Sequence, residues 1–123
     1  MEQIKKEALP EAATSQQSKV NPLYTDLSIS KRIMQVLIPT LEIIRILGDG
    51  ERQFAYYVNS NILSVYELKR SGTNHEYVKE WVGVYYDTNM FDHDKVVKEL
   101  DCAIDTMTDL LGSIRKENGY EQK

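Results

Sequence analysis

The clearest pattern of apolar and polar positions lies toward the C-terminal end of the chain. Apolar side chains recur there at spacings of three and four residues, which is the period of one face of an α-helix. They are Val97, Leu100, Ile104, Met107, Leu111 and Ile114, flanked by Val96, Ala103 and Leu110. Asn89 or Asp92 can cap the start, and Asn118-Gly119 supplies a stop signal. The pattern predicts an amphipathic helix of about 25 residues that starts near His93 and centres its buried face on Ile104.

A second helical pattern occupies residues 28–38. A serine, Ser28 or Ser30, can act as its N-cap. Apolar side chains then recur near the helical period, at Ile29, Ile33, Val36 and Leu37. Pro39 has no backbone N–H and its ring clashes with the preceding turn, so we expect a short helix that ends or kinks there.

The region from residue 41 to residue 86 is predicted to form strands. Three turn signals punctuate it, at Gly48-Asp49-Gly50, Asn59-Ser60-Asn61 and Ser71-Gly72-Thr73-Asn74. They separate four runs rich in β-branched and aromatic residues, at 41–47, 52–58, 62–70 and 77–86. Short turns between consecutive runs favour a four-stranded antiparallel β-meander.

A helical interpretation of the same region competes with the strands. Residues 41–47 could continue the first helix past Pro39. Several later apolar positions also fit one helical face, namely Phe54, Val58, Ile62, Val65 and Leu68.

Both faces of the predicted sheet carry apolar groups. In the last strand Val78, Val82 and Val84 share one parity, whereas Tyr77, Trp81 and Tyr85 share the other. A sheet with one face in water normally alternates apolar with polar residues. We therefore expect both faces to be covered, by helices or by another chain.

These patterns give an α+β fold with a short N-terminal helix, a four-stranded antiparallel β-meander and a long amphipathic C-terminal helix packed on the sheet. Residues 1–27 have little apolar periodicity and are predicted to be a flexible tether. The domain then covers residues 28–118, and residues 119–123 form a frayed tail. A chain of 123 residues has room for one such core.

Charge and composition narrow the functional classes. The net charge is −4, from 15 basic and 19 acidic residues, which argues against a general attraction to nucleic acid or to anionic lipid. No apolar run approaches the roughly 20 residues that span a bilayer, so no membrane partner is expected. A single cysteine, Cys102, and the absence of a secretory leader favour a cytoplasmic location.

The residues that could carry chemistry form no catalytic or cofactor-binding motif. The acidic corner of Asp87, Asp92, His93 and Asp94 fails the EF-hand pattern, because Asp92 and Lys98 stand where glycine and glutamate are needed. We interpret its carboxylates as helix caps, and both His75 and His93 as solvated. Cys102, near Asp101 and Asp105, is expected to be an inert thiol. The Gly48-Asp49-Gly50 segment lacks the rest of a nucleotide-binding loop and is expected to be a hairpin turn. We therefore predict that the protein is not an enzyme and binds neither a metal ion nor a cofactor.

The surplus of tyrosine, 8 residues in 123, points to a binding surface on the sheet. The predicted site combines aromatic residues with nearby cations: Tyr57, Tyr66, Tyr77, Trp81, Tyr85, Arg52 and Lys79, with Arg45, Lys69 and Arg70 as further cations. The first hypothesis is a non-catalytic interaction or assembly protein that self-associates through this aromatic sheet face or through the C-terminal helix. Its partner is a second copy or a larger protein assembly. The alternatives are single-stranded nucleic acid or nucleotide binding by stacking on the tyrosine- and tryptophan-rich sheet, and a small enzyme with a site shared across a dimer.

Overall fold

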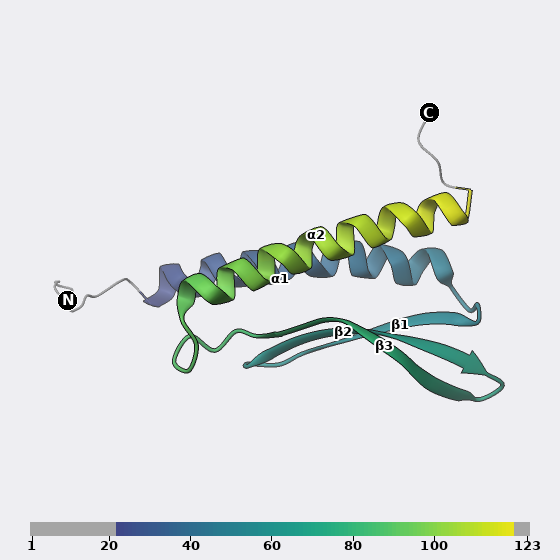
Figure 1. Ribbon diagram of the computed structural model, residues 1–123, viewed down its shortest axis with the longest axis horizontal. Coiled ribbons are helices and arrows are strands. Elements are labelled where there is room, and N and C mark those ends of the chain that lie inside the picture. The colour runs from purple at the N-terminus through teal and green to yellow at the C-terminus, as the bar shows by residue number, and fades with distance from the viewer. Residues whose placement is uncertain (1–21, 120–123) are drawn as a thin grey trace, which may run out of the picture. The chain divides into compact units, whose positions relative to one another are not determined.

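The computed structural model describes residues 22–119 and consists of two helices and three strands (Figure 1). Their order is α1 (Pro22–Leu47), β1 (Arg52–Val58), β2 (Ile62–Ser71), β3 (Asn74–Tyr85) and α2 (His93–Glu117). Contacts divide the chain into two units, Met1–Ser30 and Lys31–Lys123. The second unit is an α+β fold with an antiparallel three-stranded sheet. Of the predicted tether, residues 22–27 belong to α1, and the rest lies outside the described residues, as does the predicted tail beyond Gly119.

Helix α1 runs through Pro39 without interruption, so the predicted short helix and the predicted strand at 41–47 are both wrong. The competing interpretation, in which 41–47 continues the helix, is the one that the structure adopts. The sheet accordingly has three strands instead of four.

The reason lies in the spacing of the buried side chains of α1. They fall at Ile33, Val36, Thr40 and Ile43, so a helical seam continues across the proline. The Thr40 hydroxyl donates a hydrogen bond of 2.9 Å to the Val36 carbonyl beside the missing backbone bond. Burial of this continuous seam outweighs the one hydrogen bond that Pro39 removes.

The first turn signal ends a helix and is not the hairpin that we predicted. The backbone N–H of Gly48 donates to the carbonyl of Ile44 over 3.1 Å, and Gly48 has a φ of 55°. Glycine adopts this left-handed conformation without strain, which is why it closes so many helices.

Strands β1, β2 and β3 lie in sequence order and are all antiparallel. They fall within three of the four predicted runs or extend them by a few residues. At the first hairpin, the Asn59 side-chain oxygen accepts from the backbone N–H groups of Asn61 and Ile62, at 2.7 and 2.9 Å. At the second, Ser71 pairs with Asn74 around Gly72, whose φ is 64°.

The two ladders of the sheet differ in regularity. The β1–β2 pairing is continuous from Arg52↔Lys69 to Val58↔Leu63. The β2–β3 pairing has two register shifts, one between Val65 and Tyr66 and one between Glu67 and Leu68. Each shift adds an unpaired residue to β3 and interrupts the alternation of its side chains.

Both helices of the second unit lie on the same side of the sheet, which Figure 1 shows for α2 and for α1 from Lys31 onward. The helices run in the same direction. Arg32 pairs with Asp101 near their beginnings, at 3.0 Å, and Glu42 with Arg115 near their ends, at 3.7 Å. The core lies between the helices and the sheet, with fully buried side chains from α1, β2 and α2: Val36, Ile43, Leu63, Val65, Leu100 and Met107.

Helix α2 begins at His93 and ends at Glu117, as its sequence pattern predicts. The Asp92 side chain caps it by accepting from the Lys95 backbone N–H at 3.2 Å. The centre of its buried face differs from the prediction, because Ile104 is only half-buried. The buried residues alternate at spacings of four and three: Val96, Leu100, Ala103, Met107, Leu110 and Ile114. Helix α2 packs against both the sheet and α1. The positions of these two neighbours determine which face of α2 is buried.

None of the helices in the described range is long and apolar enough to cross a membrane.

Candidate functional site

The side of the sheet away from the helices carries four tyrosines, which we call the tyrosine face: Tyr57, Tyr66, Tyr77 and Tyr85. Leu63 and Val65 of β2 point into the core, so the residues between and after them point outward. Residues of β1 and β3 that lie directly opposite these outward residues of β2 have their side chains on the same side of the sheet. Tyr57 lies opposite Ser64, Tyr77 opposite Leu68 and Tyr85 opposite Ile62.

The rings of the tyrosine face stand largely in the open. Tyr57, Tyr77 and Tyr85 are 54%, 66% and 58% exposed, and Tyr66 is half-buried. The Tyr66 and Tyr77 ring centroids are 6.5 Å apart, and Tyr85 packs against Phe91 at 6.1 Å. Such rings offer flat apolar area together with hydroxyl groups that donate and accept hydrogen bonds.

A polar group lies at the centre of this surface. The Ser64 hydroxyl donates to a carboxylate oxygen of Glu80 at 3.1 Å, and Ser64 pairs with Gly83 in the ladder. A Cβ at Gly83 would lie 2.7 Å from Glu80 Oε1, so only glycine lets the carboxylate rest there. The tyrosine face therefore surrounds one negative charge.

Three of the seven predicted site residues lie on the opposite side of the sheet. The Trp81 indole donates to Glu67 Oε1 at 3.0 Å, and Arg52 pairs with Glu67 Oε2 at 2.9 Å. Arg52 also reaches Glu117 of α2 at 3.4 Å. Lys79 Nζ stands 4.0 Å from the centroid of the Trp81 ring. We call Arg52, Glu67, Lys79 and Trp81 the Trp81 cluster.

The predicted surface of Tyr77, Trp81 and Tyr85 is therefore wrong. Register shifts separate Trp81 from the two tyrosines, and simple alternation along a strand does not anticipate them. Partner binding by Arg52, Lys79 and Trp81 stays a prediction, for a surface other than the tyrosine face.

Every lysine and arginine on the described strands has a partner within the chain. Arg52 and Lys79 belong to the Trp81 cluster. Lys69 pairs with Glu51 at 3.6 Å, and the Arg70 guanidinium donates to the Asp49 carbonyl. Surfaces that bind single strands combine stacking rings with cations along the backbone path. Here the predicted cations Arg52 and Lys79 are separated from the tyrosines.

An open groove of about 340 Å³ lies between β3 and α2, and sequence reasoning did not identify it. Its walls include Trp81 and Val84 from β3 and Lys98, Cys102 and Thr106 from α2. Cys102 is exposed there. No sequence signal marks this groove, because it exists only where two elements distant in the chain meet.

The remaining candidates have structural roles in the described residues. Asp92 caps α2, and Asp87 accepts from the Asn89 backbone N–H at 2.9 Å. Between residues 22 and 119, no group of three or more His, Cys, Asp or Glu side chains is placed to hold a metal ion. His75 is exposed. His93 is half-buried, and its Nε2 atom is buried without a hydrogen-bond partner.

Tyr86, directly after β3, differs from the open tyrosines. Burial raises the pKa of its phenol above the ordinary value. Tyr86 is half-buried, and its phenol therefore stays neutral across the physiological range.

Comparison with protein-family models, with curated proteins and with solved structures finds no match.

Proposed function

We propose that this chain is a non-catalytic interaction protein that self-associates, and that the tyrosine face is its contact surface. One observation carries the proposal. Tyr57, Tyr77 and Tyr85 are each more than half exposed, on a side of the sheet that neither α2 nor α1 from Lys31 onward covers.

The energetics of large aromatic side chains favour a partner there. Fully burying one such side chain contributes about 1.5–3 kcal/mol. Contiguous exposed apolar area of this kind is uncommon on monomers and marks interaction sites. Tyrosine is also enriched at the centres of interfaces, because its ring buries area while its hydroxyl finds a hydrogen bond.

The C-terminal helix, the other contact surface considered, has less support. Its apolar residues, including Leu100, Met107 and Ile114, are already buried within the chain. Its outward positions are mostly polar or charged, such as Asp101 and Asp105. The sheet therefore offers the larger unpartnered aromatic surface.

A protein partner is favoured over nucleic acid by the electrostatics. The predicted cations Arg52 and Lys79 are held in the Trp81 cluster, and Glu80 places a carboxylate at the centre of the tyrosine face. A phosphate backbone would be repelled by that charge. Tyrosine hydroxyls of a second copy could instead donate to it.

The test is sedimentation velocity over a range of protein concentrations, for the parent and for a Tyr57→Ser/Tyr77→Ser double variant. The parent should associate, and the double variant should associate at least tenfold more weakly, the equivalent of about 1.4 kcal/mol. Thr108→Ser is the control, because Thr108 is exposed on α2, outside the tyrosine face. A parent that stays monomeric, or a double variant that associates like the parent, overturns the proposal. Association only in the presence of a single-stranded oligonucleotide would replace it with the stacking alternative.

A further inference from the structure

We infer a second surface for self-association, separate from the tyrosine face: the open edge of β1 together with the outward flank of α1. The flank consists of Met34, Ile38 and Leu41, and we call it the α1 flank. A second copy of this chain would pair its own β1 antiparallel to this edge. The inference goes beyond the proposed function, because it uses different residues and does not require the tyrosine face.

The hydrogen bonding of β1 shows which backbone groups point to the open edge. The N–H of Asn59 donates to the Ile62 carbonyl, and the Glu51 carbonyl accepts from Arg70, at 3.1 and 2.8 Å. The backbone N–H and C=O groups of the odd-numbered residues therefore point toward β2. In an antiparallel ladder the backbone groups alternate in direction, so the outward N–H and C=O groups belong to the even-numbered residues, Arg52, Phe54, Tyr56 and Val58.

The edge of β1 has few of the features that normally prevent strand addition, and its only charged residue is Arg52. It contains neither proline nor lysine, and its pairing with β2 is free of register shifts. The other edge strand, β3, has two register shifts and carries exposed charges such as Glu76 and Lys79. Natural sheets protect their edges with such bulges and charges. Within residues 22–119, β3 is therefore the protected edge, and no strand pairs with the outer edge of β1.

The sequence of β1 fits pairing with itself. If Phe54 lies opposite Tyr56 of the second copy, then Arg52 lies opposite Val58 of the second copy. In this register each outward N–H and C=O meets a partner. Arg52 is the only charged residue of β1 and meets an apolar residue, so no like charges are opposed. Ala55 meets Ala55 of the second copy at the two-fold axis, where strands approach most closely.

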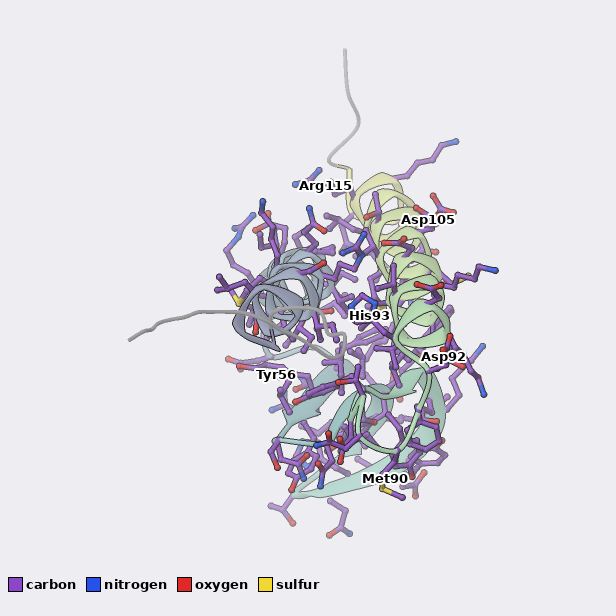
Figure 2. The ribbon with its side chains drawn as sticks, turned by 90° about the vertical axis from the view of Figure 1, so that its left-hand side faces the viewer. Tyr56, Met90, Asp92, His93, Asp105 and Arg115 are labelled. Carbon is purple, nitrogen blue, oxygen red and sulfur yellow. The ribbon has the colours of Figure 1, made fainter. Side chains whose placement is uncertain are left out.

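The α1 flank supplies apolar contact beside this strand edge. Met34, Ile38 and Leu41 are 53%, 62% and 45% exposed and recur at spacings of four and three. Arg32, which pairs with Asp101 of α2, lies on another side of the helix. In the end-on view of Figure 2, Tyr56 lies below α1, on the side of the molecule away from α2.

A second copy of this chain would cover both the open edge of β1 and the α1 flank. Pairing two β1 strands makes one continuous six-stranded sheet, with a two-fold axis perpendicular to it. All helices then lie on one side, and the two α1 flanks face each other across the axis. An unrelated extended peptide would pair with the backbone groups at the β1 edge but would leave the α1 flank exposed. The arrangement also joins the tyrosine faces of both copies into one surface.

The test is hydrogen exchange of individual β1 amides in the intact protein at low and high concentration. The outward amides of Phe54 and Tyr56 should exchange at least tenfold more slowly at high concentration, whereas the inward amides of Ala55 and Tyr57 should be protected at both. Ile38→Lys should abolish the concentration dependence, because it places like charges across the axis. Thr108→Lys, at an exposed position of α2 away from both surfaces, is the control.

Concentration-independent exchange at Phe54 and Tyr56 in the parent overturns the inference, whatever the variants do. So does a concentration dependence that survives in a folded Ile38→Lys variant. The Tyr57→Ser/Tyr77→Ser variant separates the two proposals. If it retains the protected outward amides while higher association is lost, both surfaces are in use. If the parent shows no such protection but still associates, only the tyrosine face remains.

Discussion

The Trp81 indole N–H donates to Glu67 Oε1 over 3.0 Å, and this bond anchors the only tryptophan on the helix side of the sheet. The same carboxylate pairs with Arg52, and the Trp81 ring lies 6.4 Å from that of Phe54. Trp81 is thereby integrated into the fold, whereas the tyrosines on the other side remain open. This separation divides the predicted site into a cluster held by contacts within the chain and an exposed tyrosine face.

Trp81→Phe should lower the free energy of unfolding by about 1–2 kcal/mol, because it removes a hydrogen bond to a carboxylate and weakens the contact with the Lys79 ammonium. Association should not change. Chemical denaturation and sedimentation of the same sample measure the two quantities. Weakened association at unchanged stability would place Trp81 in an interface instead.

Met107→Ala should cost about 2–5 kcal/mol of stability, because Met107 is fully buried between the helices and the sheet. Ile104→Ala, one turn away on the same helix, should cost no more than about half as much, since Ile104 is half-buried. Urea denaturation of both variants tests the rotation of α2. Equal losses would mean that Ile104 lies at the centre of the buried face after all.

Gly83→Ala should displace the Glu80 carboxylate and break its hydrogen bond with Ser64, at a cost of about 0.5–1.5 kcal/mol. The cost is modest, because the displaced group is the end of a flexible side chain. In a Glu80→Ala background the same substitution should be close to neutral. A double-mutant cycle by thermal denaturation measures this coupling, and a coupling of zero contradicts the arrangement.

Glu42 should make stability depend on pH in the acidic range. Hydrogen bonds from Arg45 hold the pKa of its carboxyl below the ordinary value, with Arg115 nearby as a further positive charge. A carboxyl with a lowered folded-state pKa stabilises the fold above its unfolded-state pKa, and this contribution is lost as the pH falls through the folded-state pKa.

Glu42→Gln should therefore be less stable than the parent at neutral pH, and the difference should shrink as the pH falls toward about 3. Thermal denaturation across this range measures the difference. Glu76→Gln, at an exposed position near the β2–β3 hairpin, is the control for the loss of one surface carboxylate. A Glu42→Gln deficit that stays constant with pH would show that the ion pair is not its cause.

Local sequence determined the features that depend on neighbouring residues. The bounds of β1 and α2, the Asp92 cap and the Asn59 hairpin follow from turn chemistry, side-chain capping and hydrophobic period, which act over a few residues. The same signals also indicated an aromatic surface on the sheet, and four of its predicted members do share one face: Tyr57, Tyr66, Tyr77 and Tyr85.

Tertiary structure decided what local signals left open. Pro39 is a helix breaker by its local chemistry, yet α1 continues because Val36, Thr40 and Ile43 are buried together on one seam. Register shifts moved Trp81 to the helix side, where Glu67 from another strand accepts its N–H. Packing against two neighbours rotated the buried face of α2 away from Ile104. In each case the decisive energy comes from burial or pairing between residues distant in the chain, and a local pattern contains no information about such partners.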